Sequence, residues 1–165
     1  MKQIVTLFIF TIILSVCAKA QTVSYNHQLL LAEGCRVTLS VAKQDTAYYI
    51  IVSVKSDRLK FLKQSTMLLK NYDNEVLKLS GELLSNDSET TGIMVGNIMV
   101  PATEIQSTAQ FSIKPEQFEL IKNGVSKIRL STTPIVHEKS FKKDKFGKKL
   151  YTFFQDLLLK TDDDF

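Results

Sequence analysis

The chain is poor in the two residues that most often staple small folds and bind metals: it has two cysteines and two histidines among 165 residues. Cys17 lies in an N-terminal apolar segment, which leaves Cys35 alone in the rest of the chain. Because one thiol cannot form an internal disulfide, we expect a fold that depends on its hydrophobic core. Cys35 is then a small buried side chain at the start of a strand; a reactive thiol or an intermolecular bridge is the alternative.

Metal and catalytic signatures are also scarce. His137-Glu138 begins the zinc motif H-E-x-x-H, but position 141 is phenylalanine. We therefore predict no metal and no cofactor, and place His137 on the surface beside a strand end. No G-x-S-x-G elbow, Walker loop or G-x-G-x-x-G fingerprint is present. A hydrolytic site built from scattered residues stays open, because such residues meet only in the fold.

Residues 1–20 have the layout of a secretory signal peptide. Lys2 precedes the apolar run Ile4–Val16, and Ala18-Lys19-Ala20 follows as a small-x-small cleavage site. The run is shorter than the roughly 20 residues that span a bilayer, and no later run is long and apolar enough to cross one. We expect cleavage after residue 20 and one domain, 21–165, in the periplasm or at the cell surface. The alternative is a lipoprotein anchored through Cys17, although valine precedes this cysteine.

The positive charge is concentrated near the C-terminus. Residues 139–160 contain seven lysines and two acidic residues, whereas residues 21–138 have as many basic as acidic residues. A general nucleic-acid-binding protein usually has a broad basic surface. The charge distribution therefore predicts no nucleic-acid partner.

The first two thirds of the chain favour strands. Residues 35–42 alternate polar and apolar, 47–55 are rich in β-branched and aromatic residues, and 65–80 are typical of a hairpin. The polar stretch 85–92 predicts a loop. Residues 93–100 are apolar around Gly96-Asn97 and fit either a bulged strand or a small hairpin. Further strands are expected at 107–113 and 125–132.

Two helices complete the predicted fold. Pro115 near the start and Asn123-Gly124 at the end mark a short helix at 115–123. Apolar residues recur with helical spacing from Phe146 to Leu158, which indicates an amphipathic helix at 144–160. The class is α+β and mostly β: an antiparallel β-sandwich or curled sheet with two helices on one face or end.

The motifs FSIKPEQFELIKNG and VSKIRLST follow a β-rich first half and an Ala-x-Ala-Gln signal. In these features, over residues 107–150, the chain resembles small exported proteins of unknown function from Gram-negative bacteria. The resemblance implies a periplasmic or cell-surface setting. It implies no activity and no functional residues.

The strongest surface signal is the lysine-rich start of the final helix. Lys142, Lys145 and Lys149 are the candidate partner-binding residues, either for a protein or cell-envelope partner or for peripheral contact with an anionic membrane. Cations at a helix N-terminus are slightly unfavourable for the helix itself, which favours another reason for them. The structural alternative is that the apolar face packs on the sheet and the lysines form its solvated side.

We therefore predict an exported, non-enzymatic binding or interaction module. One alternative is a small hydrolase with a scattered site. The other is a carrier of a hydrophobic ligand, in which residues 93–100 and the final helix line a cavity of about 300 Å³ or more.

Overall fold

The computed structural model describes residues 21–27 and 34–162, so the predicted signal peptide and Cys17 lie outside the described residues. The elements in chain order are β1 (Thr22–His27), β2 (Cys35–Gln44), β3 (Ala47–Ser56), β4 (Lys60–Phe61), β5 (Gln64–Asn71), β6 (Val76–Val95), β7 (Ile98–Ile113), α2 (Pro115–Phe118), the 3-10 helix η1 (Glu119–Ile121), β8 (Val125–Leu130), β9 (Thr132–Thr133), β10 (His137–Ser140) and α3 (Gly147–Asp162).

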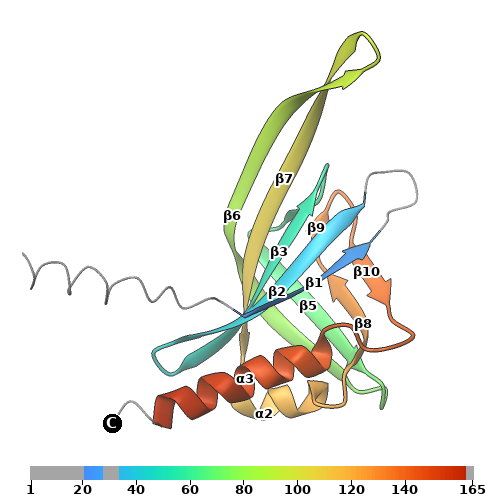
Figure 1. Cartoon of the computed structure of the whole chain (residues 1–165). Helices are drawn as coiled ribbons and strands as arrows, with labels where there is room; N and C mark the ends of the chain where they lie inside the picture. Colours follow the sequence, from blue (N-terminus) through green and yellow to red (C-terminus); the bar gives the residue numbers. More distant parts are fainter. Residues whose placement is uncertain (1–20, 28–33, 163–165) are drawn as a thin grey trace, which may run out of the picture.

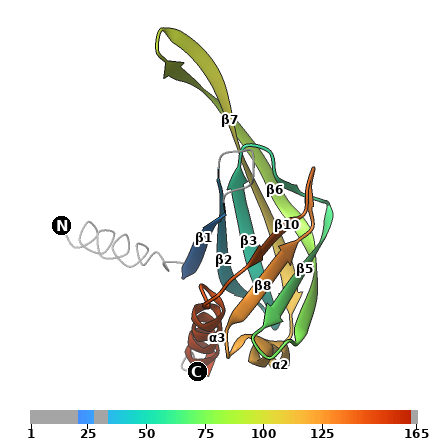
Figure 2. The same ribbon diagram turned by 90° about the vertical axis from the view of Figure 1, so that its right-hand side faces the viewer.

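Eight of the strands form one antiparallel sheet in the order β1-β2-β3-β7-β6-β5-β8-β10. The sheet curls into a half-barrel (Figures 1 and 2). The short strands β4 and β9 pair separately. This confirms the prediction of a mostly β, α+β fold, with the curled sheet rather than the sandwich as its form.

The alternating sequence of β2 and β3 explains how these two strands contribute to the core. Val37 and Leu39 of β2 are fully buried, and so are Ile50, Val52 and Val54 of β3. Period-2 alternation places such residues on one face of a strand, which here is the inner face of the sheet. The two strands join through Asp45-Thr46, where Asp45 has a φ of 53°, as a tight hairpin turn requires.

The two helical segments, α2 with η1 and α3, lie together at one end of the half-barrel (Figure 1). The first follows the prediction for 115–123, and α3 lies in the predicted C-terminal position. The apolar residues Phe146, Leu150 and Phe154 are buried against the sheet and η1. The apolar face of the lysine-rich helix therefore packs on the body of the protein, as the structural alternative predicts. None of the helices in the described part of the chain combines the length and the apolarity needed to cross a membrane.

α3 begins at Gly147 rather than at the predicted 144 because Asp144 acts before the helix. Its carboxylate accepts hydrogen bonds from the backbone N–H groups of Gly147 and Lys148, each at 2.9 Å. Asp144 also accepts from the N–H of Val125 at 2.9 Å, which ties the helix start to β8. A carboxylate in this position satisfies N–H groups that have no partner within the helix.

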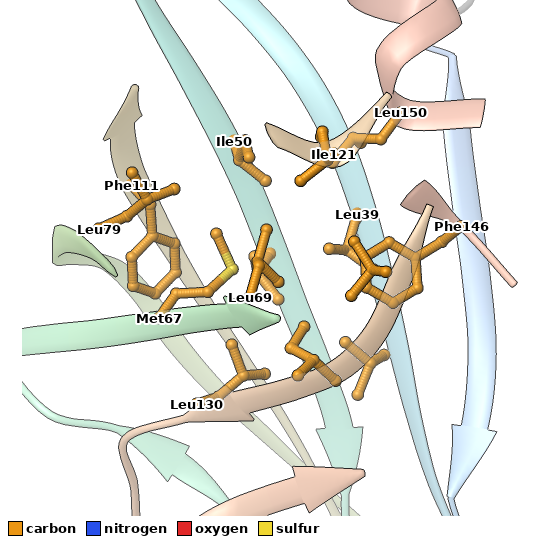
Figure 3. Close-up of a cluster of buried hydrophobic side chains, with 14 of the residues drawn as sticks. Leu39, Ile50, Met67, Leu69, Leu79, Phe111, Ile121, Leu130, Phe146 and Leu150 are labelled. Carbon is orange, nitrogen blue, oxygen red and sulfur yellow. The ribbon is translucent and has the colours of Figure 1, made fainter. Parts of the chain in front are cut away.

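The core fills the interior of the curl between the sheet and the helical end (Figure 3). Its largest fully buried side chains come from both halves of the chain: Leu39, Ile50, Leu59, Met67, Leu69, Leu79, Phe111, Phe118, Ile121, Ile128, Leu130 and Phe146. Cys35 is 1% exposed, which confirms its predicted burial.

The middle of the chain, residues 85–100, forms a hairpin of strands β6 and β7. Residues 85–92 form part of strand β6, so the loop predicted there is wrong. Their polar composition reflects exposure on both faces, because β6 and β7 continue beyond the rest of the sheet at this point (Figure 1). Of the two readings for 93–100, the small hairpin is confirmed: Val95 pairs with Ile98 across the Gly96-Asn97 turn.

Candidate functional site

The curl brings the two outermost strands of the sheet, β1 and β10, face to face. Tyr25 Oη of β1 and His137 Nε2 of β10 lie 3.1 Å apart, within hydrogen-bond distance. Lys139 Nζ donates to the backbone carbonyl of Asn26 at 2.7 Å. We call this junction the seam; it is bridged by side chains, although β1 and β10 stand at opposite ends of the sheet order.

His137 lies inside the seam and is fully buried, so the predicted surface position is wrong. Its Nδ1 lies 3.5 Å from Cys35 Sγ, and its backbone N–H donates to Thr132 Oγ1 at 3.0 Å. The imidazole lies more than 100 residues in sequence from both the phenol and the thiol. These partners and the alternation of β10 turn His137 inward.

A thiol beside an imidazole has the composition of a nucleophile and its base. Here, however, Cys35 is 1% exposed and His137 is 0% exposed. The ring of Tyr25 packs beside them, stacked on Phe146 and edge-on to Phe141. A substrate carbonyl has no access to a thiol in this position, so the arrangement supports a structural role for the cluster.

Burial of Tyr25 gives a testable dependence of stability on pH. Desolvation raises the pKa of Tyr25 far above 10, with a smaller contribution from Cys35. Above pH 10 the unfolded chain therefore releases this proton while the folded chain keeps it. The stability then falls with rising pH, by about 1.4 kcal/mol per pH unit from this group.

We expect Tyr25→Phe to remove this component. The variant loses the contact with His137 and about 1 kcal/mol at pH 8, but its stability should fall less steeply than that of the natural chain between pH 10 and 11.5. Urea unfolding at pH 8, 10 and 11.5 measures both curves. Parallel curves for the two proteins would contradict the burial of an uncharged Tyr25.

The predicted lysines Lys142, Lys145 and Lys149 are all exposed, and one of the three lines a hollow of the described surface. Lys145 lines a hollow at the seam together with Arg36 and Lys139. Lys142 and Lys149 do not belong to the residues that line it. The sequence does not distinguish Lys145 from the other lysines of this segment, and it does not indicate that Arg36 lies near them. Lys145 and Arg36 line the same hollow because the sheet curls.

The second unusual feature is the part of the β6–β7 hairpin that leaves the sheet, residues 84–104, which we call the arm. The pairing of β6 with β5 ends at Glu82, and the pairing of β7 with β3 ends at Ile105. Beyond these residues the two strands pair only with each other, at the end of the molecule opposite the helices (Figures 1 and 2). Both outer edges of the arm therefore have unpaired backbone groups among the described residues.

The tip of the arm, residues 90–103, contains no charged residue. Met94, Ile98 and Met99 are 61%, 69% and 69% exposed, and Val100 is 43% exposed. Met94 and Met99 are cross-strand partners and share one face, whereas Ile98 and Val100 lie on the other. The tip thus presents apolar side chains on both faces.

Acidic residues mark the base of the tip. Glu89 and Glu104 lie directly opposite each other in the register, and Glu104 pairs with Lys55 of β3 at 2.8 Å. Like charges opposite each other destabilise a strand pair. A two-stranded ribbon is also marginal in water by itself. The arm is therefore a poor stabilising element for the fold.

The carrier alternative predicts a cavity lined by residues 93–100 and the final helix, and four hollows on the described surface are lined by other residues. These hollows have volumes of about 570, 220, 320 and 240 Å³, and most of their lining residues are polar or charged. Within residues 21–27 and 34–162, no three histidine, cysteine or acidic side chains are grouped so that they could hold a metal ion.

No protein-family model, curated protein or solved structure matches the chain.

Proposed function

We propose that this protein is a non-enzymatic interaction module that works outside the cytoplasm and binds a partner protein with the tip of its β6–β7 arm. The observation that supports this most is the arm itself: an uncharged tip with Met94, Ile98 and Met99 each at least 61% exposed. Burying each of these side chains fully is worth about 1.5–3 kcal/mol. The isolated chain does not gain this stabilisation, because these side chains remain exposed to solvent.

A protein suits the tip better than a lipid bilayer does. The arm has open strand edges, and backbone N–H and C=O groups without partners are costly inside hydrocarbon. A protein can cover the apolar side chains and also pair with an edge, as an added strand does. The acidic Glu89 at the base of the tip would further oppose contact with an anionic membrane.

The location of the protein outside the cytoplasm is also part of the proposal. It rests on the signal-like layout of residues 1–20 and on the resemblance to exported Gram-negative proteins. The filled core and the buried position of Cys35 and His137 favour binding over hydrolysis.

Site-specific photocrosslinking in the cells that naturally make the protein tests this function. A photoreactive residue at Met99 should give one discrete adduct with another protein, identified by mass spectrometry. The same residue at Ser112, an exposed position on the body of the same strand, serves as the matched control and should not give that adduct. The double variant Met94→Ser with Ile98→Ser should reduce the adduct at position 99 by at least tenfold.

Three outcomes would overturn the proposal: no adduct at position 99, the same adducts at both positions, or an adduct made only of two copies of this chain. An adduct that is unaffected by the two serine substitutions would also contradict the role of the apolar tip.

A further inference from the structure

The seam contains a hollow of about 570 Å³ where β1, β10 and the segment before α3 meet. Three cationic side chains line it: Arg36 of β2, Lys139 of β10 and Lys145. The residues that line it include no acidic side chain. Its volume is within the range of sites for small molecules.

The acidic residues next in sequence to the two lysines of the hollow have other partners. Glu138, next to Lys139, pairs with Lys127 at 2.6 Å and with Arg129 at 3.5 Å. Asp144, next to Lys145, accepts the backbone N–H groups at the start of α3. Neither carboxylate therefore forms an ion pair with Lys139 or Lys145.

Arg36, on the other side of the seam, also has no acidic cross-strand neighbour. Asn26 of β1 and Lys55 of β3 are its cross-strand neighbours. Lys55 has its own ion pair with Glu104. Among residues 21–27 and 34–162, Arg36, Lys139 and Lys145 have no ion pair with an acidic side chain.

Lys139 is already held in position for a ligand. Its ammonium group donates one hydrogen bond to the Asn26 carbonyl at 2.7 Å and lies 5.9 Å from the centroid of the Tyr25 ring. An ammonium has three donors, so two remain for another acceptor. Fixing one end of a long side chain in advance lowers the entropy lost on binding.

We propose that this hollow is a binding site for a small ligand that carries two or more negatively charged phosphate groups. Three positive charges that have no ion pair among the described residues meet at one hollow, and an oligoanion balances them best. The planar fork of Arg36 matches two phosphate oxygens at once, and the two lysines act as point charges. Ser24 and Asn26, which also line the hollow, add polar groups that suit a hydrated anion.

The test titrates the mature chain with inorganic pyrophosphate at low ionic strength by isothermal titration calorimetry. We expect saturable binding of one ligand per chain, weakened at least tenfold by Arg36→Gln with Lys145→Gln. The matched control is Lys142→Gln with Lys149→Gln, which removes the same charge outside the hollow and should change the affinity less than twofold. Thermal unfolding of each variant confirms that it is folded.

Further arms identify the source and the chemistry of the anion. Vesicles that contain phosphatidylinositol 4,5-bisphosphate, compared with vesicles of phosphatidylcholine alone, show whether a lipid headgroup supplies the phosphates; binding to them that needs Arg36 and Lys145 supports the same site. No saturable binding of either phosphate source would overturn the proposal. Equal weakening by the control pair would show that the net charge, rather than the hollow, binds the anion. Citrate binding as tight as pyrophosphate binding would refute the preference for phosphate.

Discussion

Replacing Phe154 by alanine is expected to lower the free energy of unfolding by about 3–5 kcal/mol. The ring stacks on Phe118 of α2 with 3.8 Å between centroids, and it meets Tyr48 of β3 edge-on at 5.3 Å. Phe154 is 2% exposed, so its truncation loses apolar contact and leaves a cavity between the helices and the sheet. Urea unfolding followed by circular dichroism measures the change.

Leu159 on the same helix provides the control, since it is 65% exposed. Leu159→Ala should change the free energy of unfolding by less than about 0.5 kcal/mol. A loss below about 1 kcal/mol for Phe154→Ala would mean that the apolar face of α3 is not packed as described. That face would then again be available for a membrane surface.

The second large effect is expected when the tip of the arm is removed. Replacing residues 90–103 with an Asn-Gly turn closes the hairpin between Glu89 and Glu104, which are already cross-strand partners. Every described side chain of the removed segment is exposed except Ala102, which is half-buried. We therefore expect the free energy of unfolding to change by less than about 1 kcal/mol, while binding of the partner protein is lost.

A loss of several kcal/mol in the shortened chain would show that the tip stabilises the body. The arm would then be a structural element, and the proposed separation of folding from binding would be wrong. The apolar tip would need another explanation, because none of its described side chains belongs to the core.

The sequence predicts those elements whose periodicity comes from one buried face. β2, β3 and α3 belong to this group, because alternation or helical spacing of apolar residues reports burial directly. The edge strands β1 and β10 are short and polar, and no strand is predicted for them. Residues 85–92 predict a loop for a related reason: a strand that is exposed on both faces has the composition of a loop.

The seam is beyond what the sequence can predict. Tyr25, Cys35 and His137 meet because the sheet curls until its two ends face each other, and nothing in the local sequence encodes that contact. The same curl places Lys139 and Lys145 beside Arg36. The sequence shows one feature of the arm, the absence of charged residues over 90–103. The strand register that makes the arm a projecting hairpin appears only in the fold.

The decisive measurement concerns the partner that crosslinking at Met99 identifies. Its binding is compared for the chain of residues 21–165 and for the same chain with the shortened arm. Surface plasmon resonance on the purified proteins gives both affinities, and the unfolding midpoints of the same samples confirm that both are folded. The account predicts binding for the full chain and none measurable for the shortened chain, at matched unfolding midpoints. Equal affinity of the two chains would contradict it.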